Sequence, residues 1–423
     1  MSGEPSRLAR RLGLFDAVVI GLGAMIGAGV FAAIGPAASA AGSGLLVGLA
    51  IAAIVAYCNA TSSAQLAAIY PESGGTYVYG RERLGSFWGF LAGWGFVVGK
   101  TASCAAMALT FGSYAAPEWR RPLAVAAVVA LTAVNYHGVR KTAWLTRLIV
   151  AVVFTALAAA VAGALLGGEA SPDQLGSLTG VGGWSGILES GGLLFFAFAG
   201  YARLATLGEE VVDPSRTIPR AIPLALGLTL VVYATVAVSV LMAAGPDALA
   251  ASTTPLETAV RAGSLDWLAP VVRVGGTVAA LGVLLSLIVG VSRTAFAMAA
   301  NGELPRWLEA VHPTHRVPHR AELAVGALVG VVVVVADLRG AIGFSSFAVL
   351  TYYAIANASA WTLPAEQRRW PRAFAAAGVV GCVLLALTLP SASVSSGAAV
   401  LAAGAFLWVV RNSASASPPR WQG

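Results

Sequence analysis

Three glycines lie within seven positions near the start of the chain, in the run Gly23-Ala-Met-Ile-Gly-Ala-Gly-Val-Phe31. Glycine is a poor helix former, so a membrane-crossing helix through this run is expected to open between Ile26 and Gly29. Backbone N–H and C=O groups set free in lipid cost on the order of several kcal/mol each unless they face a partner. Because the N-terminus of a helix attracts a carboxylate, the run predicts a backbone site for a small zwitterion.

Two other interpretations apply to the same run. Gly21-Leu-Gly23 followed by Gly27 loosely imitates a dinucleotide-binding fingerprint, but that motif requires a preceding strand in a βαβ unit, which the flanking sequence does not predict. Gly23 and Gly27 also have the spacing of a small-residue packing motif, which lets two membrane helices approach closely. Close packing is compatible with an opened helix, so this second interpretation does not exclude the site.

A second run, Phe195-Phe-Ala-Phe-Ala-Gly-Tyr-Ala-Arg203, again places a glycine, Gly200, where an apolar stretch should reach the middle of a membrane. A packing glycine flanked by aromatic residues is the simpler interpretation of this run alone. The favoured interpretation is a second opened helix, because a pair of interrupted helices in corresponding positions forms the substrate site of many secondary transporters.

The composition decides which elements position these runs. Of the 423 residues, 58% are hydrophobic and 11% are charged, whereas soluble globular proteins average about 25% charged residues. The chain is therefore expected to be an all-α polytopic membrane protein. The net charge of +7 does not indicate a nucleic acid partner, because the arginines punctuate apolar runs instead of clustering on one soluble face.

Counting apolar runs of about membrane-spanning length predicts twelve transmembrane helices. They are expected at about residues 14–41, 44–69, 84–116, 122–136, 142–167, 184–211, 218–244, 267–300, 323–336, 342–363, 373–389 and 394–410. With a cytoplasmic N-terminus, 18 basic residues fall in the inside segments and 4 in the outside segments. The positive-inside rule then predicts that both termini are cytoplasmic.

The two glycine runs lie in spans 1 and 6 of this count. An odd separation of five spans reverses orientation in the membrane, which predicts an inverted repeat whose halves each begin with a discontinuous helix. The expected organisation is a cytoplasmic N-terminus (1–13), a first repeat (14–168), a second repeat (184–363), two appended spans (371–411) and a cytoplasmic tail (412–423). The abundance of alanine, with 24 arginines against 2 lysines, suggests a bacterial source and hence the inner membrane.

The motifs resemble those of a known family. Gly23 to Phe31, Pro71-Glu-Ser-Gly-Gly-Thr-Tyr77, and Phe196 to Glu210 followed by Pro214 and Pro219 are similar to three hallmarks of the amino acid–polyamine–organocation superfamily. A further set resembles its cationic-amino-acid-transporter-like branch: Ser292-Arg293, Ala299-Ala-Asn-Gly302, Leu304-Pro305 and His312-Pro313. The resemblance covers residues 14 to about 320.

This resemblance implies a LeuT-like fold of five plus five inverted helices and transport of amino acids or related amines, by proton coupling or exchange. By position, the substrate carboxylate would rest on the N–H groups of Gly27, Ala28 and Gly29. The ammonium would meet carbonyls chosen from Met25, Ile26, Phe196, Ala197 and Ala199, around Gly200. Phe196, Phe198 and Tyr201 would be gating or pocket aromatics.

Charged residues inside the expected spans include Lys100, Arg203, Arg273, Arg293 and Glu189, of which Lys100, Arg203 and Glu189 are candidates for coupling or gating. Each cation costs on the order of 2.5–3.5 kcal/mol at the bilayer centre, so it requires a partner or water. Arg273 and Arg293 lie near the ends of their span, where snorkelling or pairing suffices. Arg203, one turn past the second run, is interpreted either as a gate residue of the inward vestibule or as a structural residue.

Lys100 stands midway along the third span. Some relatives carry a lysine in span 5 at the position of a sodium ion, but this chain has Val153 where that lysine would align. We therefore expect that Lys100 supplies the missing charge, as a fixed or a titrating cation; the alternative is a lysine paired with carbonyls. Glu189 is the one acid that lies in a span away from the cytoplasmic ends of spans 1 and 6. It could assist proton entry, and the shortage of acids favours neutral or small substrates.

The sequence thus predicts a secondary transporter in a lipid bilayer, whose partners are an amino acid and protons. Alternatives are a receptor with a transporter fold, a channel, or an exchanger of polyamines or organocations. An enzyme is not expected, because no span carries a catalytic metal or nucleophile motif. No cofactor or metal is expected either, since prolines and arginines separate the histidines of His312-Pro-Thr-His315 and His319.

Overall fold

Helices dominate the fold, as expected for apolar segments that must satisfy their backbone hydrogen bonds internally in lipid. The computed structural model describes residues 12–27, 29–70, 74–138, 143–179, 181–201, 204 and 211–415. Every named element in that part of the chain is helical, and the one strand-like pairing there is an isolated parallel bridge between Leu12 and Val211. The prediction of an all-α protein is confirmed.

The α-helices are α1 (Leu14–Met25), α2 (Gly29–Ala41), α3 (Leu45–Ile69), α4 (Thr76–Leu84), α5 (Ser86–Ala115), α6 (Arg120–Tyr136), α7 (Ala143–Leu166), α8 (Gly183–Phe198), α10 (Pro214–Ala251), α11 (Pro255–Arg261), α12 (Ala269–Ala300), α13 (His319–Val335), α14 (Leu338–Trp361), α15 (Arg372–Leu387) and α16 (Ser391–Ser415). Short 3-10 turns lie between several of them. Two bear on the site: η1 (Gly42–Gly44), which joins α2 to α3, and η4 (Ala199–Tyr201), which follows α8.

Seven stretches of helix in the described residues are long and apolar enough to cross a membrane, by length and composition. One of them runs through α2, η1 and α3 together, and α1 and α15 are shorter apolar helices. These findings fit a protein embedded in the bilayer. The count of twelve spans stays a prediction.

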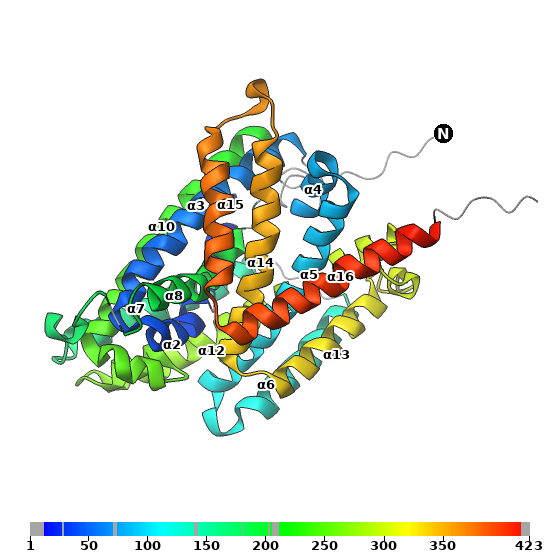
Figure 1. The fold of residues 1–423 in the computed structure, drawn as a ribbon. Helices are drawn as coiled ribbons and strands as arrows, with labels where there is room; N and C mark the ends of the chain where they lie inside the picture. The colour runs from blue at the N-terminus through cyan, green and yellow to red at the C-terminus, as the bar shows by residue number, and fades with distance from the viewer. Residues whose placement is uncertain are drawn as a thin grey trace, which may run out of the picture.

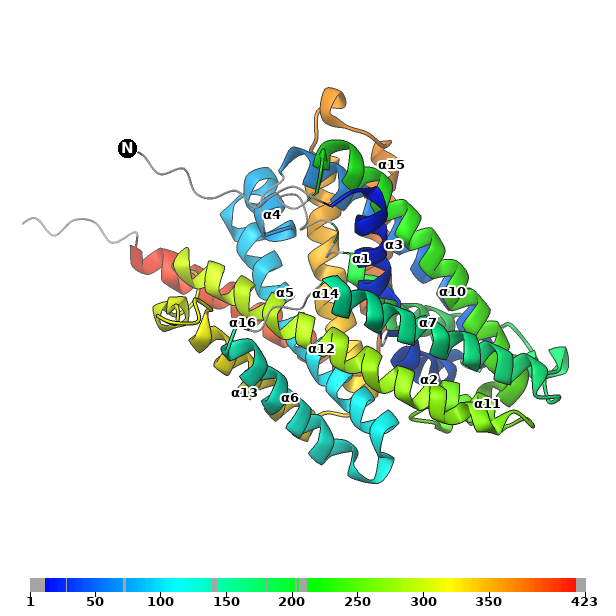
Figure 2. The same ribbon diagram turned by 180° about the vertical axis from the view of Figure 1, so that it is seen from behind.

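The helices pack as two groups that share α14 (Figures 1 and 2). In one group α3 lies beside α10, α8 and α15, and α1 and α2 pack against α10. In the other, α5 packs against α12, α6 and α16, and α13 packs against α6. Helix α14 contacts α3, α15 and α8 as well as α5, so it connects the groups. The two glycine runs both lie in the first group.

Candidate functional site

The first glycine run contains an interruption between two helices. Helix α1 ends at Met25, Ile26 caps it with φ −76° and ψ 17°, and α2 begins at Gly29. Since the first N–H groups of a helix have no acceptor within it, the first turn of α2 offers backbone donors at the break. Met25 and Ile26 are both 1% exposed. The interruption therefore lies inside the protein, at the sequence position that the glycine spacing predicts.

The second run also ends a helix. Helix α8 stops at Phe198 and continues as the 3-10 turn η4, with the N–H of Ala199 donating to the carbonyl of Phe196. Phe198 and Tyr201 are fully buried, whereas Phe196 is partly buried. Because a 3-10 turn bonds its residues at i→i+3, the backbone here departs from the α-helical pattern at the predicted glycine.

The two interruptions are in direct backbone contact. A Cβ added at Gly29 would lie 2.7 Å from the Cα of Ala197, and one added at Gly200 would lie 2.1 Å from the carbonyl oxygen of Ala24. Real Cβ atoms do not approach so closely, so both positions require glycine. A third side is closed by α12, because a Cβ at Gly27 would lie 2.3 Å from a methyl group of Val283.

A residue that sequence reasoning missed joins the two interruptions. The hydroxyl of Tyr233, in α10, donates to the carbonyl of Met25 and lies 3.0 Å from the carbonyl oxygen of Ala197. Its ring packs against Phe198 with centroids 5.2 Å apart. The available signal was a single tyrosine in an apolar span, because a buried phenol must find a hydrogen-bond partner.

The structure brings together most of the predicted site residues. Met25, Ile26, Gly27 and Gly29 lie at the first break, and Phe196, Ala197, Phe198, Ala199, Gly200 and Tyr201 lie at the second. The carbonyl of Ala199 accepts a long hydrogen bond, 3.4 Å, from the hydroxyl of Tyr353 in α14. Ala28 and Arg203 lie outside the described residues. The convergent carbonyls can accept an ammonium group, and the start of α2 can receive a carboxylate.

Comparison with known protein families identifies the family of this chain. The family of amino acid permeases matches residues 12–415. The chain belongs to the amino acid permease family. This confirms the resemblance to the amino acid–polyamine–organocation superfamily, and it makes the protein an integral membrane transporter and not an enzyme.

Relatives of this permease are similar over most of its length. An uncharacterized transporter of Mycobacterium tuberculosis is 64% identical over 407 residues, 96% of this chain and 92% of the relative. The branched-chain amino acid permease BcaP of Bacillus subtilis is 26% identical, covering 89% of this chain and 86% of the relative. The chloroplastic cationic amino acid transporter 7 of Arabidopsis thaliana is 28% identical, covering 85% and 66%.

Lys100 of the permease is buried in α5, with 8% of its surface exposed. It lies where α5 packs on α14, since a Cβ at Gly99 would meet Ala348, and the hydroxyl of Ser103 lies 2.6 Å from that of Ser345. Within the described residues, no carboxylate forms an ion pair with Lys100. A buried ammonium in such surroundings is costly, which marks a functional candidate.

Glu189 has an ion-pair partner that the sequence analysis did not foresee. One of its carboxylate oxygens lies 2.5 Å from a guanidinium nitrogen of Arg339, at the start of α14. Arg339 also donates to the hydroxyl of Ser39 in α2, at 3.1 Å. One arginine therefore ties α14 to α2, which follows the first break, and to α8, which precedes the second break.

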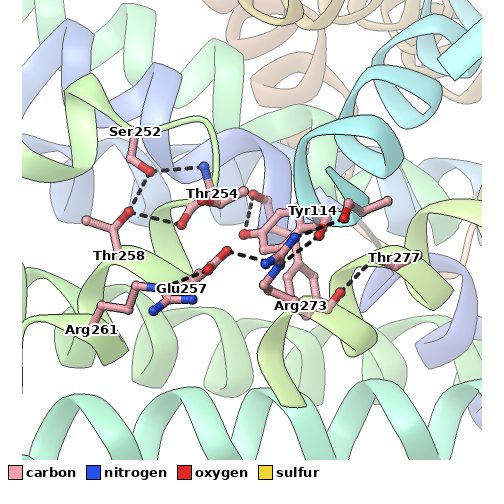
Figure 3. A network of polar contacts seen from close by, with 10 residues as sticks. Tyr114, Ser252, Thr254, Glu257, Thr258, Arg261, Arg273 and Thr277 are labelled. Carbon is pink, nitrogen blue, oxygen red and sulfur yellow. Dashed lines mark hydrogen bonds and ion pairs between the residues drawn. The ribbon is translucent and has the colours of Figure 1, made fainter. Parts of the chain in front are cut away.

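Arg273 belongs to a polar network at the same end of the permease (Figure 3). Its guanidinium donates to the carbonyls of Tyr114 and Ala115 at the end of α5, and it lies 3.8 Å from the carboxylate of Glu257 in α11. Glu257 also accepts a 2.8 Å bond from Arg261. Arg273 thus has carbonyl and carboxylate partners, in agreement with its expected structural role.

Tyr77, the last residue of the Pro71–Tyr77 motif, contacts Asn301 and Glu303, which directly follow α12. Its hydroxyl donates to Glu303 at 2.7 Å and accepts from Asn301 at 2.9 Å and from Arg81 at 2.5 Å. Burial, together with the neighbouring carboxylate, raises the pKa of Tyr77 to about 12. The phenol therefore keeps its proton at neutral pH, and it joins α4 to the end of α12 across more than 220 residues of sequence.

Proposed function

We propose that this permease is a secondary active transporter that carries amino acids, or related small amines, by alternating access. Membership of the amino acid permease family supports the class of substrate. The observation that carries the proposal is the meeting of two interrupted helices at one tyrosine hydroxyl, with carbonyls of both helices converging on it. The Tyr233 hydroxyl donates its one proton to the carbonyl of Met25 with the carbonyl of Ala197 close by, and a substrate ammonium with three protons could donate to both.

In this proposal the substrate is bound mainly by backbone. Its carboxylate rests on the N–H groups of residues 27–29, and its ammonium on carbonyls of Met25 or Ile26 and of residues 196–199. Phe196, Phe198 and Tyr201 line the space around its side chain, next to Gly200. The backbone sites proposed for the carboxylate and for the ammonium both lie in a protein interior of low dielectric, where N–H and C=O dipoles bind charged groups more strongly than they do in water.

The proposed architecture is the LeuT-like one, with twelve spans, two inverted repeats (14–168 and 184–363), two appended spans and both termini in the cytoplasm of a bacterium. Discontinuous helices that meet inside the protein are what such a repeat produces. We assign Lys100 to proton coupling and Glu189 to the outer gate, and Arg203 stays a candidate for the inner gate.

Uptake into proteoliposomes tests the proposal. The purified full chain should accumulate L-leucine or L-arginine when an inward proton gradient is imposed without sodium. In parallel, thermal unfolding across the twenty amino acids, putrescine and spermidine should show stabilisation by the transported class, because a ligand that binds only the folded state raises its apparent stability. Stabilisation without uptake or exchange would identify a receptor and reject transport.

A further inference from the structure

A cluster of polar side chains is buried between α3, α14 and α15. The amide of Asn357 donates to the side-chain oxygen of Asn59 at 2.6 Å, and the thiol of Cys382 lies 3.3 Å from the same oxygen. All three residues are 0% exposed. We call Asn59, Asn357 and Cys382 the polar clamp.

Helix α15 is seated against the polar clamp by a glycine. A Cβ at Gly378 would lie 2.3 Å from the side-chain oxygen of Asn357, so no other residue fits there without displacing the amide. The same helix packs against the glycines of α8, where a Cβ at Gly192 would lie 3.0 Å from the carbonyl of Leu385. Helix α15 lies outside the ten helices of the predicted repeat, yet it contacts the helix that leads to the second break.

The polar clamp is connected to the second break through one tyrosine. The amide of Asn357 also donates to the backbone carbonyl of Tyr353, one turn earlier in α14, at 2.8 Å. The ring of Tyr353 stacks on that of Tyr201, with centroids 5.0 Å apart and an angle of 27° between the rings. Its hydroxyl reaches the carbonyl of Ala199. Tyr353 thus contacts both ends of η4.

We propose that Asn357, held by Asn59 and Cys382, is a positioning residue that fixes Tyr353 and thereby the carbonyl of Ala199. The importance of this carbonyl for substrate rests on the function proposed above; the positioning itself does not. Buried amides cost desolvation unless they are bonded, and two atoms here, the amide nitrogen of Asn59 and the side-chain oxygen of Asn357, have no partner in the described residues. Two apolar side chains of the same size would pack here at a lower desolvation cost. The polar clamp is therefore better explained by the single arrangement of α3, α14 and α15 that its hydrogen bonds specify.

Hydrogen exchange of the full chain in nanodiscs tests the positioning without a substrate. In the double variant Asn59→Leu with Asn357→Leu, both partners become apolar, so global stability should change little. Amides of residues 197–201 should nevertheless exchange about tenfold faster, because η4 loses its support. The matched control is Ser103→Ala with Ser345→Ala, which removes another buried polar contact of α14 and should leave these amides unchanged.

If the double variant does not fold, Tyr353→Phe takes its place, because it removes a single oxygen atom. It should speed hydrogen exchange at the amides of residues 197–201 as well. Unchanged exchange at 197–201 in a folded variant, or an equal rise in the control, would overturn the inference. Uptake adds the link to function: KM for L-leucine or L-arginine should rise with Vmax retained. Faster exchange in a protein that takes up none of the twenty amino acids, putrescine or spermidine would uphold the positioning role and reject transport.

Discussion

Tyr233 supplies one phenolic hydroxyl to carbonyls of both interrupted helices. A hydroxyl has a single proton, so it donates fully to only one of the two oxygens at a time, and each carbonyl keeps a lone pair for another donor. The same carbonyls can therefore hold Tyr233 and a substrate ammonium. This places Tyr233 at the edge of the proposed site and makes it a link between its two halves.

Replacing Tyr233 with Phe should weaken binding while leaving the fold intact. The variant loses hydrogen bonds to Met25 and Ala197, at a cost of about 1–3 kcal/mol because the carbonyls stay buried. The expected result is a rise of about 5- to 150-fold in KM for L-leucine or L-arginine in proteoliposomes. Tyr352→Phe is the matched control, since that hydroxyl accepts from the N–H of Thr76, away from both breaks. Equal losses in the two variants would contradict the role assigned to Tyr233.

Lys100→Met tests proton coupling at the residue scale, because methionine keeps most of the length of the side chain and removes its charge. If the ammonium carries coupling, uptake driven by a pH gradient without sodium should fall at least about tenfold, whereas exchange of internal for external substrate should persist. Ser103→Ala, one turn further along α5, serves as the control. Gradient-driven uptake at the wild-type rate in Lys100→Met would show that this lysine is structural.

At the scale of elements, glycine spacing was enough to predict where the helices are interrupted. Glycine weakens a helix locally, so Gly27 and Gly29 point to the break between α1 and α2 without tertiary information. Gly200 gave the weaker signal, and there α8 passes into a 3-10 turn. The aromatic residues of that run, Phe198 and Tyr201, are buried because they pack on Tyr233 and Tyr353 from other helices.

What the sequence could not supply was the pairing of distant side chains. Glu189 could be singled out as an acid within a span, but its ion pair with Arg339 depends on how α8 packs on α14. Within the described residues, five of the twelve expected spans have no helix of their own that is long and apolar enough for a single crossing, as α6 and α13 illustrate. Tertiary packing, and not local composition, decides such elements.

Gly200→Ala should separate the two interruptions. The added methyl would lie 2.1 Å from the carbonyl oxygen of Ala24, which is backbone and cannot turn away. Overpacking of this kind costs about 1–3 kcal/mol, and here it pushes the two halves of the site apart. We expect loss of the thermal stabilisation that transported amino acids give to the wild type, measured by unfolding of the purified protein.

Gly290→Ala is the control for this substitution, because an added Cβ there meets no atom within 4 Å. In the middle of α12, alanine should leave stability unchanged or raise it by up to about 1 kcal/mol. If Gly200→Ala responded to ligand like Gly290→Ala, the backbone contact between the interruptions would not matter for binding.

For the whole molecule, alternating access requires that one end of the bundle opens while the other closes. Most of the site residues are buried, and two polar connections link helices at the end near α2: Arg339 with Glu189 and Ser39, and Arg273 with Glu257 and the end of α5. Opening at this end must break contacts that Arg339 makes with α2 and α8. These contacts should therefore be transient during transport.

A reversible covalent bond across this end should stop the cycle. The guanidinium of Arg339 in α14 reaches the hydroxyl of Ser39 in α2 at 3.1 Å, but a cysteine side chain is much shorter than an arginine side chain, so the thiols of Ser39→Cys and Arg339→Cys call for a reducible bis-methanethiosulfonate crosslinker in place of a direct disulfide. Crosslinking should abolish uptake of L-leucine or L-arginine, and dithiothreitol should restore it, because the crosslink holds α2 near α14. The native cysteines Cys58, Cys104 and Cys382 are buried and should not react.

The loss of Arg339 itself must be separated from the effect of the bond. Uptake by the double variant before crosslinking gives that baseline, and Ser252→Cys with Thr258→Cys gives the matched crosslinked control. The hydroxyls of Ser252 and Thr258 are 2.6 Å apart, where α10 passes into α11, so a crosslink there leaves α2 and α14 free to part. If crosslinking of Ser39→Cys with Arg339→Cys left uptake at the baseline rate, α2 and α14 would not need to part, and the end near α2 would not be the one that opens to admit substrate.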